Sequence, residues 1–160
     1  MFLLKWWLKM TRFDFYHLQV TPLEKVLPTL AEKAFATGKR IKIMVGTEER
    51  VEFLNSLLWT YNEESFLPHG SKKDGFASEQ PIFISSDENN ENGAVFMILV
   101  DGAILNEEKL SDYERVMNVF DGTDEEALNK AREYWKKIKS LNGELHYWQQ
   151  NEEGKFVQKV

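Results

Sequence analysis

The sequence contains no cysteine, which excludes disulfides, thiolate metal ligands and cysteine nucleophiles. A chain without cysteine fits a reducing compartment, so we expect a cytoplasmic protein. Histidine is scarce as well: His17, His69 and His146 stand far apart, without partners at the spacing that metal ligands need. We therefore expect no metal site.

Long apolar runs are also missing, because no stretch reaches the roughly 20 residues of a membrane-spanning helix. The first nine residues, MFLLKWWLK, are apolar and aromatic, but Lys5 and Lys9 interrupt them and no small-residue cleavage site follows. We expect no membrane association. Met10 opens what we interpret as the true domain, with a mis-assigned upstream start as the preferred explanation of residues 1–9. A short interfacial or packing segment is the alternative.

The motifs of nucleotide binding and hydrolysis are absent. Gly38 and Lys39 resemble the end of a phosphate loop, but that motif needs a glycine five positions earlier, where Lys33 stands. It also needs a hydroxyl residue after the lysine, where Arg40 stands. No GxGxxG or GxSxG occurs either. We expect no Walker motif, no catalytic residues and no cofactor, and we keep an α/β enzyme or nucleotide-binding protein with an unrecognised site as the alternative.

The bulk composition describes one globular domain with an acidic balance. A chain of 160 residues with 42% hydrophobic residues is long enough for a single core. We place that domain at residues 10–150, with residues 151–160 as a C-terminal tail. The formal net charge of −6 argues against direct, sequence-specific binding of nucleic acid, whose affinity comes mainly from Lys and Arg.

Four stretches have the aromatic, β-branched or continuous apolar composition of strands, namely residues 12–20, 40–46, 81–86 and 94–102. The last of them, AVFMILVDG, begins with a continuous apolar run of the kind found in a strand buried on both faces of a parallel sheet.

Apolar residues at helical spacing predict helices over residues 21–40, 47–61 and 124–143. Thr21 and Thr47 are the predicted N-caps of the first two helices. Alternating strands and helices predict an α/β fold, a single-domain Rossmann-like three-layer sandwich with a mostly parallel central sheet.

The remaining segments have weaker patterns. Residues 64–80 contain turn residues without helical spacing and predict a loop, and residues 87–93 (DENNENG) predict a polar, acidic turn. Residues 111–122 combine a predicted short helix with an apolar stretch. Residues 146–160 are interpreted as an extended or frayed appendage.

Large apolar groups gather where the second helix passes into its loop, in the stretch WTYNEESFLPHG. One interpretation is that Phe66 and Leu67 tuck back beneath the loop as a small satellite cluster. The other is that Trp59, Phe66 and Pro68, with His69 beside them, form an exposed patch that binds a partner protein.

The stretch AREYWKKIK stands out because residues 128–139 hold five cations and one acid in an otherwise acidic chain. On a helix the residues at spacings of three and four share one face, and Lys130 and Lys137 flank it; the face consists of Arg132, Trp135, Lys136 and Lys139. A solvated face is the simplest interpretation. A tryptophan among cations also fits an anionic peptide with an apolar tip, and it could stack a nucleic-acid base.

Several of these stretches together resemble the chi subunit family of bacterial DNA polymerase III. They are FYHL, GKRIKIMVG, LLWTYNEESFLPHG and AREYWKKIK, and the resemblance extends from Met10 to about Gln150. It implies a non-catalytic clamp-loader accessory protein with a Rossmann-like fold and no nucleotide site. Such a protein joins the psi subunit, and through it the clamp loader, to the acidic C-terminal tail of single-stranded-DNA-binding protein (SSB), which ends in phenylalanine.

The resemblance also implies roles for individual residues of the basic helix. Arg132 would bind the terminal carboxylate of the tail and Trp135 would wall the phenylalanine pocket. A basic residue expected one helical turn before the arginine is Leu128 here, which leaves Lys130 or Lys136 as its substitute. Lys139 completes the predicted tail-binding set.

The resemblance implies a second partner surface as well. The psi-facing residues of the family match Trp59 and Phe66, with Leu67, Pro68 and His69 in the same stretch. Helicase-like partners are linked to the same patch, so the partner there is the psi subunit or an equivalent clamp-loader or helicase protein.

Overall fold

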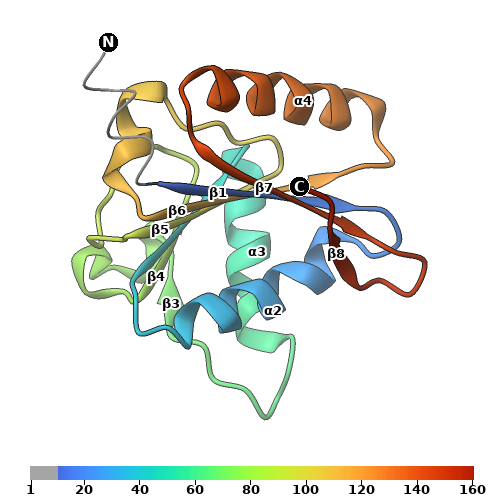
Figure 1. The fold of residues 1–160 in the computed structure, drawn as a ribbon. Coiled ribbons are helices and arrows are strands. Elements are labelled where there is room, and N and C mark those ends of the chain that lie inside the picture. The colour runs from blue at the N-terminus through green and yellow to red at the C-terminus, as the bar shows by residue number, and fades with distance from the viewer. Residues whose placement is uncertain (1–10) are drawn as a thin grey trace.

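The computed structural model describes residues 11–160, so the interpretation of residues 1–9 lies outside the described residues. Within these residues, one sheet forms the middle of the molecule, with helices on both faces (Figure 1). This three-layer α/β arrangement confirms the predicted fold class.

The sheet has eight strands in the order β3-β4-β2-β5-β6-β1-β7-β8. Their bounds are β1 Arg12–Leu18, β2 Ile41–Val45, β3 His69–Gly70, β4 Ile82–Ser85, β5 Phe96–Val100, β6 Arg115–Asp121, β7 Glu144–Gln150 and β8 Phe156–Gln158. Every neighbouring pair is parallel except β7 and β8, which pair antiparallel. The sheet is therefore mostly parallel, as predicted.

Within residues 11–160, three α-helices cover the sheet: α2 Leu23–Phe35, α3 Glu48–Thr60 and α4 Glu125–Ser140. Helix α2 begins one residue later than expected, with Pro22 rather than Thr21 at the N-cap. The Thr21 hydroxyl instead accepts a hydrogen bond from the Gln150 side chain at the end of β7, so it is engaged away from the helix. The 3₁₀ turns are η1 Lys72–Asp74, η2 Ala77–Glu79 and η3 Glu107–Asp112.

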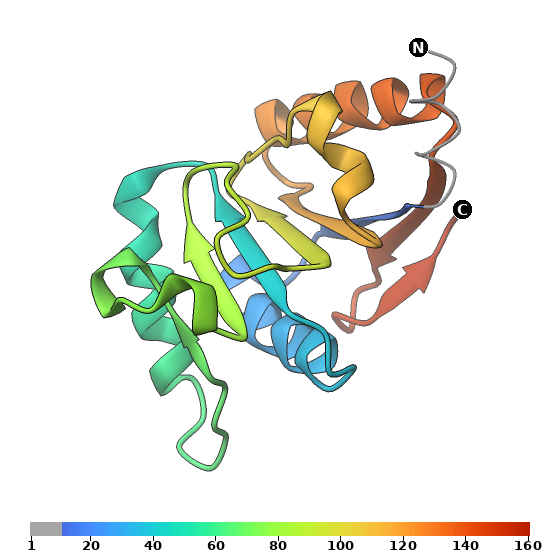
Figure 2. The same ribbon diagram turned by 90° about the vertical axis from the view of Figure 1, so that its left-hand side faces the viewer.

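Each face of the sheet has its own apolar core. Helices α2 and α3 pack on one face, around residues such as Leu27 and Leu54. Helix α4 packs on the other through Ala131, Tyr134 and Ile138, and η3 lies beside it on that face (Figure 2). The face that a side chain occupies therefore determines which helix it meets.

Besides the two-residue strand β3 in the predicted loop 64–80, two segments contain strands that the sequence patterns did not predict. Residues 115–121, interpreted only as an apolar stretch, form β6 in the middle of the sheet, because β5 and β1 supply parallel partners on both sides. The segment from His146 onward is extended as expected, but it belongs to the sheet. Strand β7 pairs with β1 along six residues, and β8 closes the edge.

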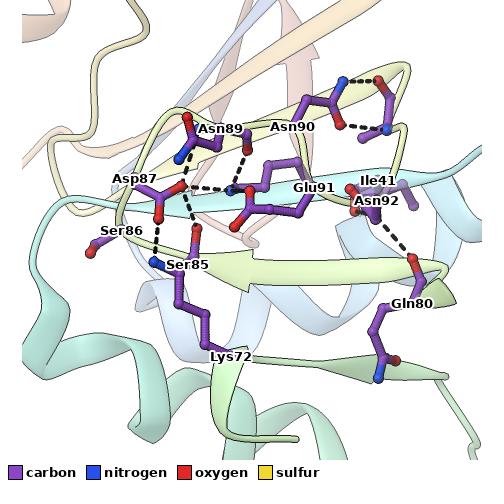
Figure 3. Close-up of polar contacts among 12 residues, drawn as sticks. Ile41, Lys72, Gln80, Ser85, Ser86, Asp87, Asn89, Asn90, Glu91 and Asn92 are labelled. Atoms are coloured by element: carbon purple, nitrogen blue, oxygen red, sulfur yellow. Dashed lines mark hydrogen bonds and ion pairs between the residues drawn. The ribbon is translucent and has the colours of Figure 1, made fainter. Parts of the chain in front are cut away.

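The acidic turn after β4 is fastened to a buried lysine of β2. The Lys42 side chain is completely buried, and its Nζ donates to Glu91 at 2.9 Å and to the Asn89 carbonyl at 2.7 Å. Asp87 lies 3.5 Å from the same nitrogen and also pairs with Lys72 (Figure 3). Asn92 completes the attachment by donating to the carbonyls of Ile41 and Gln80, each at 3.0 Å.

Candidate functional site

The predicted cationic residues of α4 form an exposed surface, which we call the basic face: Arg132, Trp135, Lys136 and Lys139. Helix α4 starts at an N-cap aspartate, Asp124, whose carboxylate accepts from the Glu126 backbone N–H at 3.1 Å. The three cations of the basic face are exposed, and no carboxylate of residues 11–160 lies within ion-pair distance of them. Their positive charge is available to a ligand.

Trp135 anchors the basic face to the sheet. Its side chain is half-buried, and its ring meets Phe15 of β1 edge-on, with centroids 5.2 Å apart. Tyr147 of β7 packs against it in the same manner at 5.6 Å. One part of the indole is thus held in place while another faces solvent among cations, as an aromatic anchor for a peptide requires.

His17 and Tyr147 support the floor beside Arg132. The Nδ1 atom of His17 lies 2.6 Å from the Tyr147 hydroxyl. Burial lowers the pKa of His17, and the Arg132 charge lowers it further, while Asp121 acts in the opposite direction. Burial raises the pKa of Tyr147 and Arg132 opposes the shift. The guanidinium therefore lies close enough to act on both rings.

The His17 ring is also closed off on its other edge. A Cβ atom added to Gly122 would lie 1.8 Å from His17 Nε2, so a residue with a side chain at position 122 would displace the imidazole. The sequence patterns missed both His17 and Tyr147 as site residues, although the alternation in FDFYH could have placed His17 on the same face as Phe15.

Lys130 lies apart from the basic face. It borders the 101–104 loop, with its Nζ 3.9 Å from the point where a Gly102 Cβ would be. Lys137 lies on the same flank and pairs with Glu107 at 3.6 Å. Leu128, which stands at the family's basic position, is half-buried and packs into the core beneath α4. The structure thus groups Lys136 with Arg132 and separates Lys130 from it.

The second candidate surface lies at the end of α3 and the loop after it, and we call Trp59 and Phe66 the aromatic pair. Trp59 is 46% exposed and Phe66 is 75% exposed, with ring centroids 6.1 Å apart. Leu67 is buried in the core, and Pro68 is half-buried. Each interpretation of this stretch agrees with part of the structure. Leu67 packs into the core, whereas Phe66 is exposed.

His69 fixes the geometry of this loop. The ring is buried, with Nδ1 2.6 Å from the Leu67 carbonyl oxygen and Nε2 2.8 Å from that of Asn55. Trp59 packs on it with centroids 4.2 Å apart. The aromatic pair is therefore an exposed surface that the buried, hydrogen-bonded ring of His69 supports from below.

Comparison with known protein families identifies the family of this chain. Residues 10–146 match the family described as "DNA polymerase III chi subunit, HolC". The chain belongs to the chi subunit family. The resemblance inferred from the motifs is confirmed over most of the chain, and the family is an accessory part of DNA polymerase III.

A curated relative carries the same description. The chain is 33% identical over 91 residues to "Probable DNA polymerase III subunit chi" of Rickettsia prowazekii (strain Madrid E). The alignment covers 57% of this chain and 55% of the relative, so the chain spans about half the length of the relative that it matches.

Two further observations bear on other kinds of site. Within residues 11–160, no helix combines the length and the apolar character that crossing a membrane requires. The same residues contain no group of three or more His, Cys, Asp or Glu side chains placed to hold a metal ion.

Proposed function

We propose that this chi-family chain is a non-catalytic adaptor of DNA replication. It binds the acidic C-terminal tail of SSB at the basic face and the psi subunit, or an equivalent clamp-loader or helicase partner, at the aromatic pair. It acts in the cytoplasm, where it links the clamp loader to DNA covered by SSB.

One observation carries the proposal that the basic face binds the SSB tail. Cations without a nearby carboxylate in residues 11–160 lie on the same helix face as Trp135, whose ring is packed against the sheet. Arg132 presents a planar fork of donors suited to a terminal carboxylate. Trp135 lies one helical turn away, where it would contact the ring of the phenylalanine that carries that carboxylate. Lys136 and Lys139 continue the positive charge along the helix for the acids of the tail.

The placement of the two surfaces supports the adaptor role. The basic face belongs to the α4 layer, whereas the aromatic pair belongs to the α3 layer on the other side of the sheet (Figure 1). Two partners can therefore be bound together without competing for space, which is what a connector requires.

Calorimetric titration of the full chain with a short acidic peptide ending in Asp-Ile-Pro-Phe tests the proposal. We expect micromolar binding that disappears when the final phenylalanine is removed, because the ring is lost and the terminal carboxylate moves to the preceding proline. Equal binding of the two peptides would reduce the basic face to a non-specific cationic surface. If neither peptide bound, the proposed tail-binding role would be contradicted and the family membership would account for the fold alone.

A further inference from the structure

A separate cavity of about 630 Å³ lies at the carboxyl edge of the sheet. It is bordered by the ends of β1, β5 and β6 and by the first turns of α2 and α4. It contains neither the basic face nor the aromatic pair. Its volume falls within the range of about 300 to 1,000 Å³ that is typical of ligand pockets.

The topology explains why a cavity forms there. The chain leaves β1 through α2 toward β2, and it leaves the neighbouring strand β6 through α4 toward β7. These two connections diverge to opposite sides and cover opposite faces of the sheet. In open α/β sheets, ligands bind in the crevice at such a divergence.

An unpartnered amide is directed into this cavity. Asn118 lies in β6 between Val116 and Phe120, on the face that α4 covers, and it lines the cavity. The residue is only 8% exposed, and its side-chain amide is hydrogen-bonded to no other side chain or backbone group of residues 11–160. Its amide atoms are not among the fully buried atoms of residues 11–160 that lack a hydrogen-bond partner, so they remain accessible from the cavity, where a ligand can exchange hydrogen bonds with them.

The charges of the lining select the sign of that ligand. The carboxylates outnumber the cations, with Glu24, Asp101, Asp121, Asp124 and Glu126 against Arg50 and Lys130. Arg50 already donates to Glu24 at 2.7 Å and to Asp101 at 2.8 Å. The other three carboxylates face a single lysine, and a phosphate or carboxylate ligand would be repelled.

We propose that this cavity binds a basic side chain, arginine or lysine, of a partner peptide. The Asn118 carbonyl oxygen accepts a hydrogen bond from the cationic head group, and its amide nitrogen donates to a peptide carbonyl. Glu126 and Asp124 at the rim neutralise the charge, and Phe120 and Ala131 contact the aliphatic stem. The site goes beyond the proposed adaptor function, because it shares neither surface with it.

The test uses the full chain labelled with ¹⁵N and follows the side-chain amide resonances of Asn118 by NMR. The probes are the blocked tripeptides Gly-Arg-Gly and Gly-Lys-Gly, with Gly-Glu-Gly and ATP as the opposing ligands. We expect saturable shifts with a basic tripeptide, in the millimolar range for so small a probe, and no shift at Asn118 with the other two. Shifts with ATP, or saturation by none of the tripeptides, would overturn the proposal.

Matched variants locate the interaction. Glu126→Gln at the rim should weaken the basic tripeptide about fivefold, whereas Glu125→Gln, one residue away and outside the cavity lining, should not change it. Asn118→Leu should weaken it about tenfold. Unchanged affinity in both Glu126→Gln and Asn118→Leu would refute the site.

Discussion

The indole N–H of Trp148 donates a 2.9 Å hydrogen bond to the carboxylate of Asp14 and so joins β7 to β1. The carboxylate is completely buried and also accepts from Arg12 at 2.9 Å and from Arg115 at 2.7 Å. Three strands thus converge on one anion, on the face of the sheet that α2 covers and opposite α4. Loss of the Asp14 carboxylate should therefore destabilise the whole domain.

Asp14→Asn should lower the free energy of unfolding by about 3 kcal/mol, because two arginines lose their buried counter-charge. Urea denaturation followed by circular dichroism measures it. The control is Glu114→Gln, which removes an exposed 3.5 Å pair with Lys39 and should cost less than about 1 kcal/mol. Equal losses of stability in the two variants would show that the buried Asp14 carboxylate contributes no more than an exposed carboxylate does.

The same carboxylate predicts how stability depends on pH. Burial alone would raise the pKa of Asp14, but the hydrogen bonds from Arg12, Arg115 and Trp148 outweigh it and lower the pKa. A lowered folded-state pKa contributes stability above the unfolded value of about 3.9, and that contribution is lost as the pH falls through the folded value. Wild-type and Asp14→Asn stabilities should therefore converge at acid pH, and a constant difference between pH 7 and pH 2 would contradict this.

Lys42→Met should destabilise the domain by about 3 kcal/mol, because Glu91 and the Asn89 carbonyl lose a buried cation. The matched control is Lys72→Met. It removes the other lysine that pairs with Asp87, but from an exposed position, and should leave the free energy of unfolding nearly unchanged. Thermal denaturation of both variants decides whether the acidic turn depends on the buried lysine.

For the basic face, Arg132→Ala should lower SSB-tail affinity by about 1.5 to 3 kcal/mol, roughly 10-fold to 150-fold, because a charge-assisted pair is removed. Lys137→Ala is the control on the opposite flank of α4, where Lys137 already pairs with Glu107. Calorimetry at two salt concentrations should show weaker binding at the higher one. An Arg132→Ala protein that binds like the control would place the tail elsewhere.

For the aromatic pair, Phe66→Ala should weaken binding of the psi subunit or its equivalent by about 2 kcal/mol while leaving the melting temperature unchanged. Phe76→Ala is the control, since Phe76 is 76% exposed and Phe66 is 75% exposed. Titration with the purified partner distinguishes them. Loss of both partner and tail binding in Phe66→Ala would indicate misfolding instead.

The sequence predicted the helices and the strands with continuous apolar runs, because their periodicity is local. It failed at β6, where Asn118 and Arg115 interrupt the apolar pattern and only the neighbouring strands decide the conformation. It failed in part at β7, because HYWQQ has no distinctive flanks and its pairing with β1 closes a long loop. Secondary structure that depends on distant partners cannot be read from a short window.

The candidate site shows the same division. Spacing within one helix predicted that Arg132, Trp135, Lys136 and Lys139 share a face, and it could have separated Lys130, which stands two residues before Arg132 and so points to another side. His17 and Tyr147 come from two strands 130 residues apart and meet only through the sheet. Their contribution required the topology.

The short outer strands of the sheet have a consequence for how this molecule recognises others. One edge is the two-residue β3 and the other is the three-residue β8. Little backbone is offered at either edge for a foreign strand to extend the sheet, which also limits edge-to-edge aggregation. Partners must instead read side chains on helices and loops, so binding specificity can change by single substitutions without disturbing the hydrogen-bonded frame.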